Sequence, residues 1–150
     1  MKKKGKTKQK IYIKDSSFES PKAPQIFTEK WQPEINLQIN SSFKVVADAT
    51  HEVVLNVTVT AKQGERTAFL AEIQQAGLFT VKGFDSKAFA QLMGSYCPTL
   101  LFPFARESIA DMVNRGGFPQ LLLAPINFEA LYAQHMAQQV TQSAKQKPVH

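Results

Sequence analysis

Strict alternation between apolar and polar residues most limits the folds open to this chain, and it occurs in two neighbouring stretches, residues 34–48 and 51–62. The apolar positions are Ile35, Leu37 and Ile39 in the first stretch and Val53, Leu55, Val57 and Val59 in the second. A period of two is typical of a β-strand with one buried face. The pattern therefore predicts two strands of an antiparallel sheet with one covered face.

Two further strands are predicted on either side of this pair. Residues 11–24 begin with β-branched and aromatic residues and end in prolines, which stop a strand. Residues 62–65 read KQGE, a turn in which Gly64 can adopt the positive φ of a hairpin, and residues 66–81 follow as the next strand. The chain is therefore expected to form four antiparallel strands.

Helical patterns begin only after the strands. Asp85 or Ser86 can cap a long helix that runs to Arg115, where Gly116–Gly117 favours its end. Asn127 can cap a shorter last helix. Its apolar stripe is Phe128, Leu131, Tyr132, His135 and Met136. Because the strands precede the helices without alternation, the predicted fold class is α+β.

The apolar residues of the long helix recur every four positions, from Phe89 to Val113. Each four-residue step overshoots a full turn by about 40°, so the stripe sweeps round the helix. A helix lying on one sheet needs only one apolar face. Pro98 and Pro103 are expected to kink it and redirect the stripe. We therefore predict that other copies of the chain cover this helix and that the protein oligomerises through it.

The net charge of +6 is concentrated near the N-terminus, where seven lysines fall within the first fourteen residues. We expect residues 1–10 to be a basic disordered arm, residues 11–140 to be the folded domain and residues 141–150 to be a flexible tail. The arm could instead bind nucleic acid weakly by neutralising phosphates. No aromatic residue is interleaved before Tyr12, which argues against a nucleic-acid partner.

Residues for catalysis do not form any recognisable motif. The three histidines lack metal-ligand spacing, and no glycine-rich phosphate loop or nucleophile elbow is present. We expect no enzyme activity, no metal and no cofactor. Cys97 cannot form an internal disulfide, is interpreted as a small buried hydrophobe, and agrees with a reducing, cytoplasmic location. No apolar run has the length of a membrane span, and the apolar segment after the lysines is too short for a signal peptide.

Phenylalanine is frequent, at 11 residues, and several fall in predicted loops or at the edges of elements. These are Phe18, Phe27, Phe79, Phe102 and Phe118, to which the only tryptophan, Trp31, can be added. Each of them could pack in the core, or together they could line an apolar groove for extended partners. The sequence leaves both interpretations open.

Six segments together resemble the SecB protein-export chaperones. They read YIKDSSFESPKAP, WQPEINL, EVVLNVTVTA, FLAEIQQAGLF, GSYCPTLLFPFARE and RGGFPQLLLAPINFEALY, and they lie in order between residues 11 and 139. The resemblance implies a four-stranded antiparallel sheet followed by a long kinked helix and a short C-terminal helix. It also implies a homotetramer, a dimer of dimers in which the long helices lie between two eight-stranded sheets.

The resemblance further implies a function in the bacterial cytoplasm. SecB chaperones hold exported precursors unfolded without ATP and deliver them to the SecA motor ATPase. The implied groove for these client proteins consists of Trp31, Ile35, Leu37, Ile39, Phe128, Leu131 and Tyr132. Extended chains offer scattered apolar side chains, which such a groove buries with low specificity.

A SecA-binding face is also implied by the resemblance. It maps to Asp15, Glu19, Leu70 and Glu72. Strand alternation supports a shared face, although an ordinary solvated face has the same pattern. Residues expected to support tetramer packing are Ala71, Ile73 and Gln75 on the opposite side of the strand, with Cys97 and Leu101.

Two other functions remain as alternatives to export. A chaperone of the same fold can protect an antitoxin and so control a toxin–antitoxin system. The basic N-terminal residues could instead make the protein a nucleic-acid-binding module. Both ends of this chain depart from the SecB pattern, whose members are acidic overall with polar or acidic tails.

Overall fold

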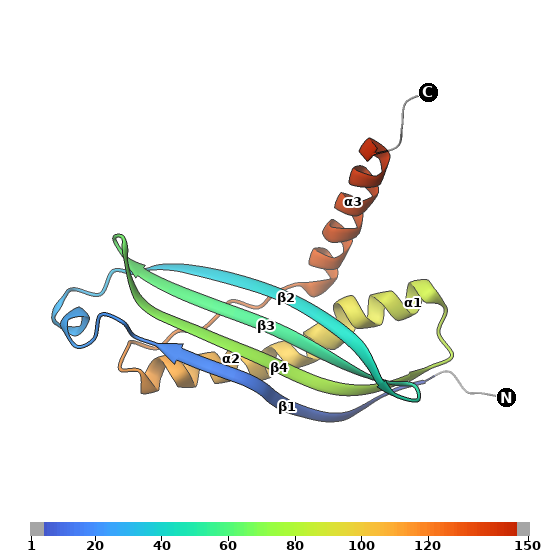
Figure 1. Cartoon of the computed structure of the whole chain (residues 1–150), viewed down its shortest axis with the longest axis horizontal. Coiled ribbons are helices and arrows are strands. Elements are labelled where there is room, and N and C mark those ends of the chain that lie inside the picture. The colour runs from blue at the N-terminus through green and yellow to red at the C-terminus, as the bar shows by residue number, and fades with distance from the viewer. Residues whose placement is uncertain (1–4, 147–150) are drawn as a thin grey trace.

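The alternating segments pair into an antiparallel sheet of four strands in the order β1-β4-β3-β2 (Figure 1). The computed structural model describes residues 5–146. The strands are β1 (Gly5–Glu19), β2 (Glu34–Ala47), β3 (Thr50–Gln63) and β4 (Arg66–Lys82). The predicted number of strands and their antiparallel pairing are confirmed. Because the first strand pairs with the fourth, β1 and β2 form the two edges of the sheet.

Residues 5–10 belong to β1, so the prediction that they form a disordered arm is wrong. Lys6 pairs with Val81 of β4, and its Nζ lies 3.9 Å from the centroid of the Tyr96 ring. Backbone pairing does not depend on the side chain, and lysines at a sheet edge keep their ammonium groups in water. Residues 1–4 of the expected arm lie outside the described residues.

The predicted long helix consists of three consecutive segments. They are α1 (Ser86–Gln91), the π-helical turn η2 (Leu92–Tyr96) and α2 (Cys97–Arg115). Asp85 caps α1 by accepting a hydrogen bond from the Ala88 N–H at 2.8 Å. In η2 the Cys97 N–H donates to the Leu92 carbonyl five residues back. Pro98 then lies in the first turn of α2, directly after η2.

The last helix, α3 (Phe128–Gln146), is longer than predicted. It has 19 residues, the same number as α2, and it includes residues 141–146 of the expected flexible tail. Asn127 caps it as expected, because its Oδ1 accepts a hydrogen bond from the Ala130 N–H at 3.0 Å. The helix projects away from the sheet (Figure 1). Residues 147–150 of the expected tail lie outside the described residues.

The core lies between α2 and the inner faces of β3 and β4. Five α2 residues spaced by four are buried: Cys97, Leu101, Ala105, Ile109 and Val113. A second row on the long helix remains open, since Tyr96 is 38% and Phe104 is 43% exposed. The chain therefore uses one apolar row for its own core and covers the other only in part.

Cys97 is buried as a small hydrophobe, which confirms its interpretation. Burial raises the pKa of its thiol to about 12, and nearby Lys6 opposes this only in part. A thiol with so high a pKa carries almost no thiolate at neutral pH and is a poor nucleophile.

Candidate functional site

A groove of about 590 Å³ separates β2 from α3. Its apolar lining is Ile39, Phe43, Leu55, Ala90, Met93, Phe128, Leu131, Tyr132 and Met136. The remaining lining residues are Asn40, Ser41, Gly94, His135 and Gln139, so no Asp, Glu, Lys or Arg of the described residues lines it. An open, uncharged and mostly apolar groove can bury the apolar side chains of an extended chain.

Four of the seven predicted groove residues line this groove: Ile39, Phe128, Leu131 and Tyr132. Phe128 is only 5% exposed, and its ring meets the Phe102 ring edge-on at 5.7 Å. Phe128 therefore fixes the start of α3 against α2. Leu131 is 46% exposed and offers its side chain to whatever enters the groove.

Ile35 and Leu37 lie beside the groove on the same strand as Ile39. They pair with Ala61 and Val59 of β3, whose side chains are buried in the core. Each is 38% exposed, because β2 is an edge strand that the helices do not fully cover. The two residues extend the apolar row of β2 beyond the groove.

Trp31 does not line the groove. Its ring lies 5.2 Å from the Phe118 ring and stacks on Phe69 at 6.3 Å. Phe18 and Phe27 also contact Phe118, which is itself buried. These five aromatic residues pack together, so core packing accounts for Phe18 and Phe118, while Phe27 remains 47% exposed.

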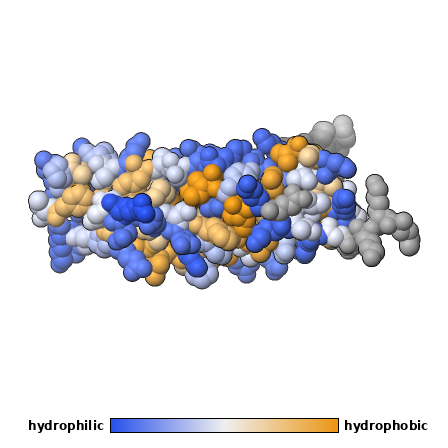
Figure 2. Space-filling view, turned by 90° about the horizontal axis from the view of Figure 1, so that it is seen from below, coloured by the Kyte–Doolittle hydropathy of each residue, from blue (hydrophilic) through white to orange (hydrophobic). Residues whose placement is uncertain are grey.

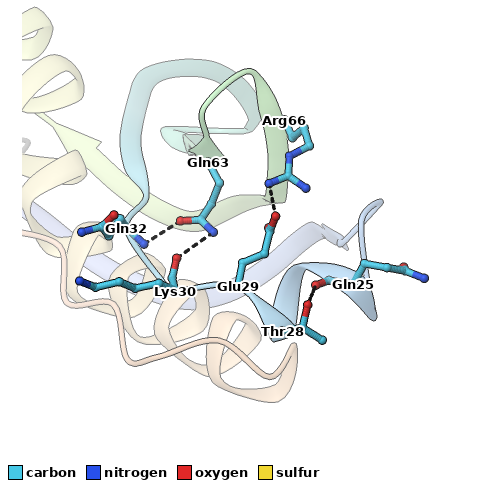
Figure 3. Close-up of polar contacts among 7 residues, drawn as sticks. All are labelled: Gln25, Thr28, Glu29, Lys30, Gln32, Gln63 and Arg66. Atoms are coloured by element: carbon cyan, nitrogen blue, oxygen red, sulfur yellow. Dashed lines mark hydrogen bonds and ion pairs between the residues drawn. The ribbon is translucent and has the colours of Figure 1, made fainter.

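Polar contacts hold the Trp31 loop against the turn between β3 and β4 (Figure 3). The Gln63 side chain accepts a hydrogen bond from the Gln32 N–H at 2.6 Å and donates one to the Lys30 carbonyl at 3.2 Å. Arg66 forms an ion pair with Glu29 in the same loop. The residues that hold this loop therefore belong to β3 and β4, and neither of them lines the groove.

Several groove residues were not predicted as site residues. Phe43, which is 50% exposed, continues the odd-numbered row of β2 and could have been found from that alternation. His135 and Met136 belong to the apolar stripe of α3 and could have been found from its spacing. Met93 gives no such signal, because its helical spacing equally fits the core.

The predicted acidic residues share the outer face of the sheet. Glu19 pairs directly with Leu70, and Ser17 pairs with Glu72. Asp15 pairs with Gln74, two residues further along the same face of β4. Asp15, Glu19 and Glu72 are exposed, and Leu70 is half-buried between them. The register thus brings all four predicted residues together, and we call them the acidic face.

The residues expected at the tetramer contact are buried within one protomer. Ala71, Ile73, Gln75, Cys97 and Leu101 are at most 2% exposed. Gln75 donates a hydrogen bond to the Tyr12 carbonyl at 3.1 Å, while its Oε1 has no hydrogen-bond partner among residues 5–146. These side chains therefore lie between β4 and α2 and are not available for direct contact with another copy.

A buried carboxylate, Glu52, lies on the outer face near the acidic face. Lys14 Nζ lies 2.7 Å and Lys44 Nζ 3.9 Å from its Oε1, and the Tyr12 hydroxyl donates to its Oε2. The hydrogen bonds from Lys14 and Tyr12 lower the pKa of Glu52. Burial, together with the hydrogen bond to Glu52, raises the pKa of Tyr12 to about 12.

Comparison with known protein families identifies the family of the chain that carries this groove and acidic face. Residues 2–139 match the family described as preprotein translocase subunit SecB. The chain belongs to the SecB family. The SecB match starts at residue 2, so it includes the basic residues 5–10, and it ends close to the expected domain boundary at 140.

Relatives named protein-export protein SecB share half or more of their residues with this chain. The identity is 56% for the SecB of Nitrosococcus oceani, over 91% of this chain and 83% of the relative. It is 52% for Methylococcus capsulatus, over 91% and 89%, and 50% for Marinobacter nauticus, over 91% and 82%. SecB proteins are export chaperones and not enzymes, so both predictions are confirmed.

The fold is similar to that of a solved SecB-like chaperone from Mycobacterium tuberculosis, in complex with a ChAD peptide of the HigA1 antitoxin. The TM-score is 0.68 over 81% of this chain and 90% of that one, at 16% identity. The similarity confirms the α+β class. Among the described residues, no helix is both long and apolar enough to span a membrane.

Proposed function

We propose that the protein holds unfolded precursor proteins in the groove between β2 and α3, without ATP, in the bacterial cytoplasm. The observation that carries this proposal is the groove itself, which is open, mostly apolar and lined by no Asp, Glu, Lys or Arg of the described residues. Each apolar side chain buried there contributes about 25 cal/mol per Å² of surface removed from water. The exposed row of Ile35 and Leu37 extends the binding surface, so a long segment is held by many weak contacts.

Delivery to the SecA motor is the second part of the proposal. Asp15, Glu19 and Glu72 give the outer face an exposed cluster of negative charge, with Leu70 as an apolar contact at its centre. The groove opens between β2 and α3, whereas the acidic face involves β1 and β4. SecA can therefore dock while a client still occupies the groove.

We further propose that the protein assembles as a dimer of dimers. The exposed side chains of Tyr96 and Phe104 leave apolar surface on the helical side of the sheet. Figure 2 shows apolar side chains at the surface along the length of the molecule. Covering α2 with a second sheet would bury this surface. Ala71, Ile73 and Gln75 of β4, together with Cys97 and Leu101 of α2, would hold α2 on its own sheet for that contact.

Antitoxin protection is the alternative function. The Mycobacterium tuberculosis chaperone bound to an antitoxin peptide shares only 16% of its residues with this chain, so it supports a common fold. The relatives at 50–56% identity are named for protein export. Export is therefore the better supported function.

An aggregation assay tests the holding function. An unfolded precursor is diluted from denaturant with the protein, without ATP, and light scattering is recorded. We expect suppression at a stoichiometric ratio and no suppression by an equal mass of an unrelated folded protein. Aggregation at the same rate with and without the protein would contradict the proposal.

A further inference from the structure

Gly94 lies in the middle of the π-helical turn η2 and lines the groove together with Tyr132 of α3. A Cβ atom added to Gly94 would lie 2.6 Å from Cδ2 and 2.8 Å from Cε2 of the Tyr132 ring. Real carbon atoms do not approach so closely, so the ring occupies the place where any other residue would carry its side chain.

The backbone of Gly94 does not itself require glycine. Its φ is negative and helical, unlike those of Gly64, Gly83 and Gly117, which are positive. Glycine in a helix is unfavourable relative to alanine, because it loses more backbone entropy on folding. The space taken by the Tyr132 ring is therefore the reason that the structure gives for glycine at this position.

The same contact determines where α3 lies. Among the described elements α3 packs chiefly against η2, and beyond its first residues it projects away from the sheet (Figure 1). Phe128 anchors its start, and Tyr132 makes the next contact one turn later. Because Leu131 and Met136 lie on the same helix, the position of the Tyr132 ring sets the distance of this groove wall from β2.

We propose that Gly94 is a positioning residue for the groove: because it has no side chain, the Tyr132 ring packs against it, and this contact fixes the wall formed by α3. The proposal rests on the holding function for its consequence, which is that the contact between Gly94 and Tyr132 controls how long a bound chain is retained. Most differences in affinity among variants of one site arise in the dissociation rate.

Gly94→Ala tests the contact between Gly94 and Tyr132 in the full-length protein. Gly5→Ala is the control, because nothing lies within 4 Å of a Cβ added to Gly5. Hydrogen exchange of α3 is measured without any client, and the dissociation rate of a fluorescent unfolded precursor is measured separately. We expect Gly94→Ala to speed exchange in the first turns of α3, and client release, by about tenfold each. Gly5→Ala should change neither.

The double variant shows whether Gly94 acts through the ring. Tyr132→Ala removes the ring, so adding Gly94→Ala to it should have no further effect on exchange. Equal effects of Gly94→Ala in both backgrounds would overturn the proposal. Slower exchange in Gly94→Ala would also overturn it, because that result is expected if only helix propensity matters. If the wild type binds no unfolded chain, the holding function fails, and the exchange measurements still decide the role of Gly94.

Discussion

Glu52 illustrates at the scale of one residue how a polar group is kept in the sheet. Its side chain is only 9% exposed, and Tyr12, Lys14 and Lys44 satisfy its two oxygens. A buried carboxylate with charged donors is stable, whereas donors left without their acceptor are costly. The cluster ties β1 to the central strand β3 across β4 and also neutralises Lys14, the neighbour of Asp15 in the acidic face.

Glu52→Gln should lower the free energy of unfolding by about 1–2 kcal/mol at pH 7, because charge-assisted hydrogen bonds are lost. The pKa of Glu52 in the folded protein lies below its ordinary value of 4.5. Its charge therefore contributes stability above that value and loses this contribution as the pH falls through the lowered pKa. The difference between variant and wild type in urea denaturation should shrink below pH 4.5.

Glu72→Gln provides the comparison for Glu52, because Glu72 is exposed on the same face of the sheet. This control should change the free energy of unfolding by less than about 0.5 kcal/mol. A difference between Glu52→Gln and wild type that stays constant from pH 7 to pH 3 would show that the charge of Glu52 is not the source of the effect.

Glu72→Lys tests the acidic face. We expect it to weaken SecA binding by at least about tenfold, measured by calorimetry, because it replaces one of three carboxylates with a cation beside Asp15 and Glu19. Suppression of precursor aggregation should remain unchanged. Glu65→Lys makes the same change of charge in the exposed turn between β3 and β4, outside the acidic face. An equal loss in both variants would mean that only net charge matters.

At the scale of elements, β1 shows most clearly that a run of like charges can form a strand. Residues 5–10 are dominated by lysine and were predicted to be disordered, yet they pair with β4 opposite Phe79 and Val81. A strand edge can accept such a segment because the hydrogen bonds come from the backbone and the lysine side chains extend into water.

Deleting residues 1–10 should therefore lower the melting temperature by about 5–10 °C, as expected for the loss of about 2–3 kcal/mol in a chain of this size. Deletion of residues 1–4 alone is the control and should change it by less than about 2 °C. Differential scanning calorimetry makes the comparison. Equal melting temperatures for the two deletions would support the disordered arm instead.

Other elements followed more directly from the sequence. Alternation predicted β2 and β3, because a half-buried strand leaves a period of two in any sequence that forms it. The residues KQGE predicted the turn at Gly64. The four-residue row was predicted to be covered by other copies of the chain, whereas its α2 part is buried within one protomer. The π-helical turn was not predicted, because one extra residue per turn hardly alters a short apolar pattern. The length of α3 was also missed, since its polar end gives no packing signal.

The site was predictable only in part, because contacts between distant segments leave no signal in the local sequence pattern. Ile39 and the α3 residues were identified through the family resemblance, and the register of β1 with β4 gathers the acidic face as alternation suggested. Phe43 and Met93 join the groove because η2 packs against β2 and α3 packs against η2, which are contacts between distant segments. Trp31 was placed in the groove by resemblance, whereas its ring packs on Phe69 and Phe118.

At the scale of the whole molecule, one protomer only partly buries the second apolar row of its long helix. Tyr96 and Phe104 lie on this row, on the helical side of the sheet. Multi-angle light scattering should therefore give about 67 kDa, the mass of four 16.7 kDa chains. A mass of one chain at micromolar concentration would contradict the proposed assembly.

The most direct test of the holding function compares the affinity of an unfolded precursor for wild type, Leu131→Glu and Leu122→Glu. Both leucines are exposed, at 46% and 68%, but only Leu131 lines the groove. A charge in the groove should weaken binding at least about tenfold, because an apolar contact is replaced by a carboxylate that must lose its water. The expected result in calorimetry is this loss for Leu131→Glu and unchanged affinity for Leu122→Glu. Equal affinity of wild type and Leu131→Glu would show that unfolded chains are held elsewhere.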